Sequence, residues 1–234
     1  MNKTIITTSW DDGHKLDIKL SRLLKKYNIK ATFYISPKNH EFRGVDLLSS
    51  IDIKELSKYF EIGAHTLTHP HLSKITLKEA EAEIKNSKDY LEGVIDKKIT
   101  AFCYPYGDYN KQVIELVRKH GFLLARTTTR YSFSLPKDDF QTATTFHTYN
   151  HYSDILRIVA FSNLNLSSLV QYTQWDNLAI DLFQRALKKK AVFHLWGHSW
   201  EFEKYKSWDR LERVFAAISN NPNVIYATNS QLIK

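Results

Sequence analysis

Two adjacent carboxylates near the start of the chain are the first residues whose types and spacing could do chemistry. Asp11 and Asp12 follow a β-branched run that ends at Trp10, and Gly13 comes next. Carboxylates at the end of a strand point in different directions, so one can bind a metal ion while the other stays free as a base. Gly13 permits the tight turn that this needs. Asp-Asp-Gly is also the composition of an ordinary turn.

A second group is the pair of histidines in the segment His65-Thr-Leu-Thr-His69. Histidines four positions apart on a helical turn point the same way and can share one metal ion. A nearby carboxylate would complete a site of two histidines and one aspartate, which leaves a position open for water or substrate. Zinc is the expected ion, and iron, cobalt, nickel or manganese also accept such ligands. The chain has ten histidines, so this spacing also arises by chance.

Two further candidates follow later strands that the sequence predicts. The segment Tyr104-Pro105-Tyr106-Gly107 comes after an apolar run near Phe102, and His198 comes after a run near Trp196. The carboxyl ends of parallel strands meet at one edge of a sheet or at one mouth of a barrel. We therefore expect all four groups to converge on one site.

Short β-branched or aromatic runs alternate with helical periods along the chain, which predicts a parallel sheet in an α/β fold. Strands are expected at 4–10, 31–35, 61–64, 100–104, 123–126, 191–196 and 224–227. Helices are expected at 16–27, 53–59, 76–91, 111–120, 180–189 and 208–219, and residues 131–175 as loop with helical pieces. The number of units favours a closed or nearly closed barrel, with a doubly wound open sheet as the alternative. No linker or repeat interrupts the pattern, so a single domain over 1–234 is predicted.

The composition excludes several classes of protein. The 234 residues are 43% hydrophobic and 13% aromatic, which supports a full core and excludes disorder for most of the chain. A single cysteine excludes a disulfide scaffold. No signal peptide or apolar run of ~18–20 residues is present, so a cytoplasmic protein without a membrane span is expected. The net charge of +8 favours anionic partners, but the lysines are scattered and no nucleic-acid motif occurs, so no nucleic-acid partner is expected.

The motifs together resemble a known family, the polysaccharide deacetylases of carbohydrate esterase family 4 (the NodB-homology domain). Ser9-Trp10-Asp11-Asp12-Gly13 is similar to its T-F-D-D-G motif, and His65-Thr-Leu-Thr-His69 to its H-[ST]-x-x-H motif. Residues 102–107 resemble its F-R-x-P-Y-G motif, and 196–198 lie where it has a late L-x-L-H histidine. The resemblance implies a distorted (β/α)7 barrel and the metal-dependent removal of acetyl groups from sugars.

The resemblance also implies roles for individual residues. Asp11 would be the general base. Asp12, His65 and His69 would hold one divalent metal ion. The backbone N–H of Tyr106 would help to bind the oxyanion.

The late histidine of the family would be the general acid, and this sequence offers two candidates for it. We prefer His198, because it lies beyond the predicted strand and Glu201 could orient it. His194, in the segment Ala191-Val-Phe-His194, is the alternative and could instead be a core histidine.

Besides this ambiguous late motif, the sequence departs from the family pattern at two further points. Cys103 stands where the family has an arginine that orients the catalytic base, and Arg126 or Arg130 could substitute from a neighbouring strand. The family's D-x-x-D-W motif is not found near residues 127–133.

The substrate implied by the resemblance is an N-acetylated amino sugar in a polysaccharide or oligosaccharide. The alternatives are an O-acetylated glycan, or glycan binding without catalysis. Pro105, Trp196 and His14 are the candidate substrate-binding residues, whereas His147 and His151 are interpreted as surface histidines. No oligomeric state is predicted.

Overall fold

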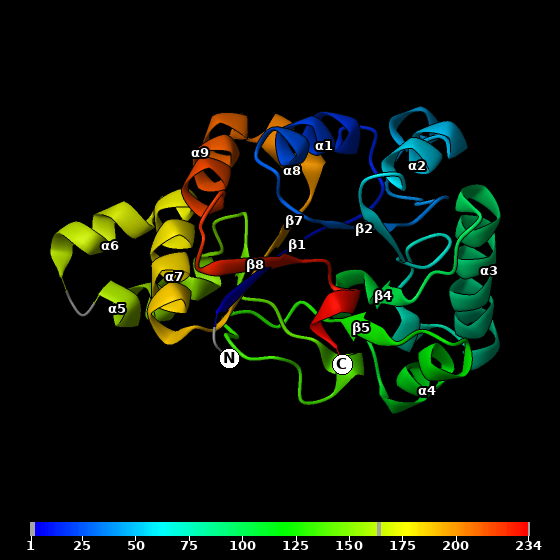
Figure 1. The fold of residues 1–234 in the computed structure, drawn as a ribbon. Coiled ribbons are helices and arrows are strands. Elements are labelled where there is room, and N and C mark those ends of the chain that lie inside the picture. Colours follow the sequence, from blue (N-terminus) through cyan, green and yellow to red (C-terminus); the bar gives the residue numbers. More distant parts are fainter. Residues whose placement is uncertain (1–2, 163–164, 234) are drawn as a thin grey trace.

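A curled sheet of parallel strands lies at the centre of the structure, a computed structural model that describes residues 3–162 and 165–233 (Figure 1). The strands are β1 (Thr4–Trp10), β2 (Thr32–Ile35), β3 (Glu61–Ala64), β4 (Ala101–Cys103), β5 (Leu124–Arg126), β6 (Phe146–His147), β7 (Val192–Gly197) and β8 (Val224–Ala227). Their order is β5-β4-β3-β2-β1-β7-β6, and β8 also pairs with β1. The first half of β1 pairs with β8 and its end pairs with β2, so β1 lies at the middle of the sheet.

The chain between β5 and β6 spans the gap between the two edges of the sheet. The N–H of Thr127 donates to the carbonyl of Thr142, and that of Tyr131 to the carbonyl of Thr145, each at 2.9 Å. Thr145 in turn donates its N–H to the carbonyl of His194 on β7 at 3.0 Å. This closure by irregular backbone makes the fold a distorted (β/α) barrel. The predicted barrel is confirmed, and the alternative of an open doubly wound sheet is not observed.

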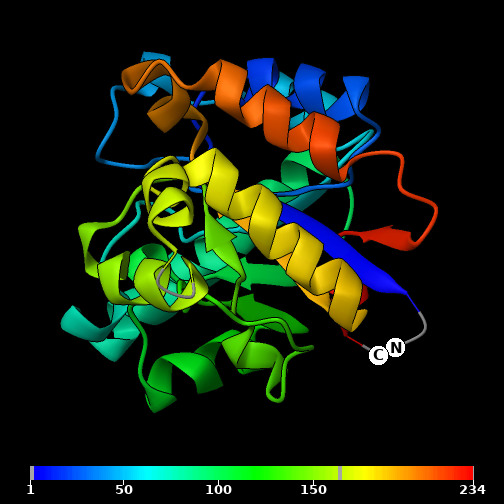
Figure 2. The ribbon, with the colours of Figure 1, turned by 90° about the vertical axis from the view of Figure 1, so that its left-hand side faces the viewer.

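Helices pack around the outside of the curled sheet (Figures 1 and 2). They are α1 (Asp17–Lys26), α2 (Ser50–Leu56), α3 (Leu77–Ile95), α4 (Lys111–Lys119), α5 (Ile155–Ser162), α6 (Leu166–Tyr172), α7 (Trp175–Lys189), α8 (Ser199–Lys204) and α9 (Trp208–Ile218). The predicted capping box of α3 is present, because the Thr76 hydroxyl accepts from the N–H of Glu79 and the Glu79 carboxylate accepts from that of Thr76. In Figure 1, α5 and α6 lie at one side, beyond α7.

The hydrophobic core fixes the end of β1, from which the first two carboxylates leave. Trp10 is fully buried, and its ring packs edge-on against Phe202 of α8 and Phe215 of α9, each at 5.9 Å between centroids. Aromatic pairs of this geometry add about 0.5–1.5 kcal/mol to the effect of burial alone. The backbone at residues 11 and 12 therefore begins from a rigid point.

Most predicted elements are found, with shifted ends. A capping box between Ser49 and Asp52 starts α2 three residues before the predicted helix. The structure adds β6 and α8, which the sequence analysis did not predict, and α5 and α6 are the helical pieces expected within 131–175. Within the described residues, no helix combines the length and the apolar character needed to cross a membrane.

Candidate active site

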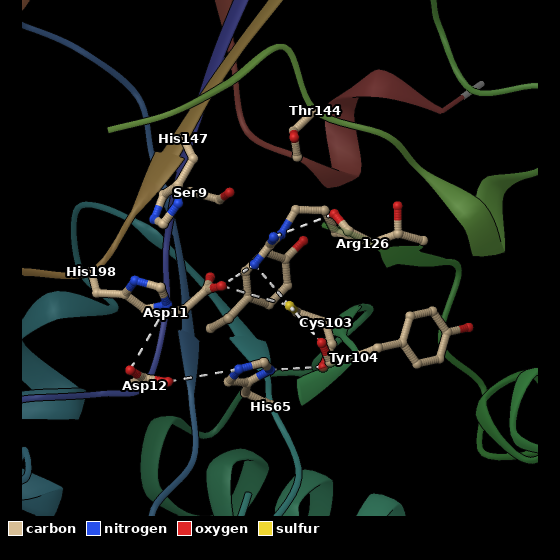
Figure 3. Close-up of polar contacts among 12 residues, drawn as sticks. Ser9, Asp11, Asp12, His65, Cys103, Tyr104, Arg126, Thr144, His147 and His198 are labelled. Carbon is tan, nitrogen blue, oxygen red and sulfur yellow. Dashed lines mark hydrogen bonds and ion pairs between the residues drawn. The ribbon is translucent and has the colours of Figure 1, made fainter. Parts of the chain in front are cut away.

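The carboxyl ends of the strands open into a cavity of about 480 Å³. Seven predicted site residues line it: Asp11, Asp12, His65, His69, Tyr106, Trp196 and His198. They lie at or just beyond the ends of β1, β3, β4 and β7, which is where side chains of parallel strands converge. Figure 3 shows four of them, Asp11, Asp12, His65 and His198, gathered in one region.

Three buried ligand atoms converge in this cavity. Oδ1 of Asp12 lies 3.4 Å from Nε2 of His69 and 3.8 Å from Nε2 of His65, and the two nitrogens are 3.1 Å apart. This oxygen has no hydrogen-bond partner among the described residues. Burial lowers the pKa of each histidine to about 4, so both rings are neutral near pH 7 and offer a lone pair. A buried carboxylate oxygen without a partner, facing two neutral histidines, fits a divalent cation.

Neighbouring groups orient these three side chains. Nδ1 of His65 donates to the backbone carbonyl of Cys103 at 2.8 Å, which leaves Nε2 unprotonated and directed into the cluster (Figure 3). The indole N–H of Trp200 donates to Oδ2 of Asp12 at 2.8 Å, so that Oδ1 is the oxygen left for a ligand. Such outer contacts set the tautomer and orientation of metal ligands.

Helix α3 holds the loop that carries the two histidines. The carboxylate of Glu83 accepts hydrogen bonds from the N–H of Leu67 at 2.9 Å and from the N–H and hydroxyl of Thr68, each at 2.8 Å. His69 has a φ of 67°, a left-handed conformation that costs a non-glycine residue roughly 1–3 kcal/mol. The bonds to Glu83 help to hold the loop in this conformation.

Asp11 forms a buried ion pair with Arg126, the last residue of β5 (Figure 3). Burial raises the pKa of Asp11, but the positive charge of Arg126 outweighs this effect and holds the pKa below its usual range. Asp11 is therefore ionised. Nη2 of Arg126 also lies 2.8 Å from Sγ of Cys103, whereas Arg130 pairs with Asp154 at 2.9 Å. Of the two candidate arginines, Arg126 is thus the one that contacts Asp11.

His198 lies at the cavity and His194 does not. Nδ1 of His198 bonds to Glu201 at 2.9 Å, and Nε2 lies 4.0 Å from Oδ2 of Asp12. Burial lowers the pKa of His198, but the charges of Glu201 and Asp12 outweigh it and raise the pKa to about 10. His194 is 1% exposed, and its Nε2 bonds to the hydroxyl of Ser9 at 2.8 Å within the sheet. Of these two histidines, only His198 therefore presents a protonated ring to the cavity.

The family model described as polysaccharide deacetylase matches residues 1–125, which is more than half of the chain and includes the three motifs of the amino-terminal half. The chain belongs to the polysaccharide deacetylase family. This match confirms the family resemblance of the sequence motifs.

Individual relatives agree with this assignment. The chain is 30% identical over 126 residues to a poly-β-1,6-N-acetyl-D-glucosamine N-deacetylase of Staphylococcus aureus, a match that covers 48% of this chain and 41% of that protein. The deacetylase PplD of Streptococcus pyogenes, solved with acetate, is 26% identical with a TM-score of 0.54 over 58% of this chain and 62% of that one. The chain spans 23–44% of the length of the curated relatives it matches.

Similarity over the whole chain is visible only in the fold. The Xyl-CE4 domain of a multidomain xylanase, from the hindgut metagenome of Trinervitermes trinervoides, aligns with 99% of this chain and 90% of its own. Its TM-score is 0.63 and its sequence identity is 14%. It therefore supports the predicted (β/α)7-type architecture of this family member.

The remaining predicted site residues differ in whether they line the cavity. Tyr106 has a φ of 57° in the turn after β4, and its hydroxyl bonds to Glu41 at 2.5 Å. Pro105 opens this turn and is buried, and it is not among the residues that line the cavity. His14 is also buried and absent from the lining, with its ring edge-on to Phe42 at 5.2 Å.

The interpretation of His147 as a surface histidine is wrong. Its ring is 4% exposed, stacks on Trp196 at 4.0 Å between centroids and bonds to Glu201 at 3.2 Å. His151 is half-buried and lines the cavity with it. A strand of only two residues carries His147, and so short an element leaves no periodicity in the sequence.

Proposed function

We propose that the protein is a metal-dependent hydrolase that removes acetyl groups from N-acetylated amino sugars in a polysaccharide or oligosaccharide. One observation carries the proposal. The cluster of Asp12, His65 and His69 shares a single cavity with the carboxylate of Asp11, which pairs with Arg126, and with the ring of His198, which bonds to Glu201. The names of the deacetylases to which the chain is similar support the same substrate class.

Asp12, His65 and His69 would hold the ion, with zinc as the first choice and cobalt, nickel, iron or manganese as alternatives. A divalent cation bound there would polarise the acetyl carbonyl and favour deprotonation of water. Side chains and backbone groups of the protein would carry out the proton transfers and stabilise the oxyanion.

Asp11 would take the proton of the attacking water, since one of its oxygens is held by Arg126 and Oδ1 has no partner among the described residues. The backbone N–H of Tyr106 would stabilise the oxyanion. His198 would give its proton from Nε2 to the departing nitrogen as the carbon–nitrogen bond breaks.

A histidine that Glu201 orients at the cavity, and that could give a proton to a leaving group, supports an amide substrate more than an O-acetyl ester. An amine is a poor leaving group unless it is protonated, whereas a sugar alkoxide depends less on a strong acid. The alternative of a glycan-binding protein without catalysis is less well supported, because the cavity offers a side chain of suitable chemistry for each role proposed here. The cytoplasmic location expected from the sequence stays a prediction.

The test is acetate release from N-acetylglucosamine oligomers by the zinc-loaded protein. We expect the parent to release acetate and Asp11→Asn to lose turnover while it keeps its metal. His120→Leu, a change at the half-buried histidine that directly follows α4 and bonds to Glu81 away from the cavity, is the control and should be as active as the parent. Equal rates for the parent and Asp11→Asn would contradict the mechanism, and glycan binding without acetate release by the parent would favour the non-catalytic alternative.

A further inference from the structure

A chain of hydrogen bonds leads away from the proposed general acid, and the proposed function uses only its first member. Oε2 of Glu201 lies 2.9 Å from Nδ1 of His198 and 3.2 Å from Nε2 of His147. Nδ1 of His147 lies 2.7 Å from Nε2 of His151. Glu201 and His147 are 7% and 4% exposed, so these bonds form away from bulk water.

The chemistry of the four groups fixes which atoms carry protons. Burial raises the pKa of Glu201, but the charge of His198 and the hydrogen bond from His147 outweigh this effect and keep it below its usual range. An ionised carboxylate only accepts hydrogen bonds, so His198 must donate from Nδ1 and His147 from Nε2. Burial lowers the pKa of His147, and its neutral ring is left with Nδ1 as an acceptor for His151. Each donor in the chain therefore meets one acceptor.

The ring of His147 is held in place by the sheet itself. His147 on β6 pairs in register with Trp196 on β7, and the two rings stack with an angle of 11° between their planes. The ring of His198 lies edge-on to His147 at 5.3 Å. Glu201 thus bonds to two histidines: His147, which the sheet holds in place, and His198, which faces the cavity.

We propose that His147 is a positioning residue for the general acid, and that its hydrogen bond to Glu201 keeps the His198 ring turned so that Nε2 faces the reacting bond. His151 supports it by fixing the tautomer of His147. The inference rests on the proposed function, in which the carbon–nitrogen bond breaks, its electron pair stays on nitrogen, and that nitrogen takes the Nε2 proton of His198. Glu201 remains ionised throughout.

A second metal ion held by His147, His198 and Glu201 is the competing explanation, because their ligand atoms also cluster. Their hydrogen bonds argue against it. Both nitrogens that face Glu201 already have that carboxylate as partner, whereas Oδ1 of Asp12 in the first cluster has none among the described residues.

The leaving group of the substrate tests the proposal. Hydrolysis of an N-acetylglucosamine oligomer needs a proton on the departing amine, but 4-nitrophenyl acetate releases a stable phenolate without one. For zinc-loaded His147→Leu we expect kcat on the oligomer to fall roughly 10- to 100-fold, as displacement of a catalytic group does, with little change in KM. The rate on 4-nitrophenyl acetate should stay at that of the parent. His147→Gln, which keeps an N–H donor, should recover most of the loss, and His120→Leu should match the parent on both substrates.

Three results would overturn the inference while leaving the proposed function intact. They are equal losses on both substrates in His147→Leu, full activity of that variant on the oligomer, and two zinc ions per chain in the parent against one in the variant. A parent that releases acetate from neither substrate would contradict the proposed function, and this inference with it.

Discussion

Arg126 and Cys103 show how the proposed general base, Asp11, has an arginine partner although position 103 carries a cysteine. The family resemblance places the arginine at position 103, but here the guanidinium reaches Asp11 from the adjacent strand, with the Cys103 thiol against it. Cys103 and Arg126 are in register on β4 and β5, so their side chains compete for the same space beside Asp11. The arginine partner of the proposed base can therefore come from either of these two neighbouring positions.

Exchanging the two residues tests this interpretation. The single variant Arg126→Cys should have a free energy of unfolding about 3–5 kcal/mol lower than that of the parent, because it leaves a buried carboxylate without its partner. It should also lose roughly 100-fold in the rate of acetate release, since the base is no longer held in place. The double variant Cys103→Arg/Arg126→Cys should regain part of the lost stability and part of the lost rate of acetate release. Urea unfolding and acetate release measure the two effects, and a single variant that matches the parent in both would refute the role of Arg126.

The buried His194 predicts how stability depends on pH. Burial and the nearby charge of Arg126 lower its pKa from 6.5 to about 3, so between these values the unfolded chain binds a proton that the folded chain does not. The free energy of unfolding therefore falls as the pH falls. His194 alone should account for a loss of about 2 kcal/mol between pH 7 and pH 5.

The measurement is urea unfolding of the chelated protein at the two pH values. His194→Gln keeps a group that can bond to the Ser9 hydroxyl but does not titrate. Between pH 7 and pH 5, the free energy of unfolding of this variant should therefore fall by about 2 kcal/mol less than that of the parent. The same pH dependence in both proteins would show that His194 is protonated in the folded state.

At the scale of elements, α3 holds the loop of the proposed metal ligands through the side chain of Glu83. Glu83→Gln keeps the shape of the carboxylate but weakens its bonds to residues 67 and 68, so the loop that carries His65 and His69 should lose order. We expect metal affinity to fall roughly 10- to 100-fold, as for other changes to groups that support metal ligands. Glu81→Gln is the matched control, because Glu81 lies on the same helix and pairs with Lys119. Competition for zinc with a chelating dye measures both, and equal affinities would contradict the role of Glu83.

Local sequence signals found most of the elements and the residues that leave their ends. The β-branched run 4–10 and the capping box at Thr76 correspond to real elements, and the first of them places Asp11 and Asp12 where expected. The residues that were missed reach the site through pairing between distant segments. His147 sits on a two-residue strand, and Glu83 bonds to a loop 15 and 16 residues away, so neither leaves a local pattern in the sequence.

At the scale of the whole molecule, the two halves of the chain contribute differently to one cavity. The family match at residues 1–125 includes Asp11 and the three proposed metal ligands, whereas Arg126, His147, His198 and Glu201 lie after it. β1 joins the halves, since it pairs with β2 on one side and with β7 on the other. A change at the centre of the sheet should therefore affect the proposed base, the proposed metal ligands and the proposed acid together.

Binding of the ion should stabilise the entire fold, because the three ligands come from the ends of two strands that meet only in the folded chain. At a free zinc concentration 100 times the Kd, the free energy of unfolding should rise by about 2.7 kcal/mol. Urea unfolding with zinc and with chelator measures the difference. An unfolding midpoint that does not respond to zinc would indicate that the folded site does not bind the ion.

Elemental analysis of metal per chain, after chelation and reloading with zinc, tests the central claim most directly. The parent should retain about one ion after removal of free metal, and His69→Ala should retain none, because the variant removes one of three ligands. No bound ion in the parent, or the same content in both proteins, would contradict the assignment of Asp12, His65 and His69 as the metal centre.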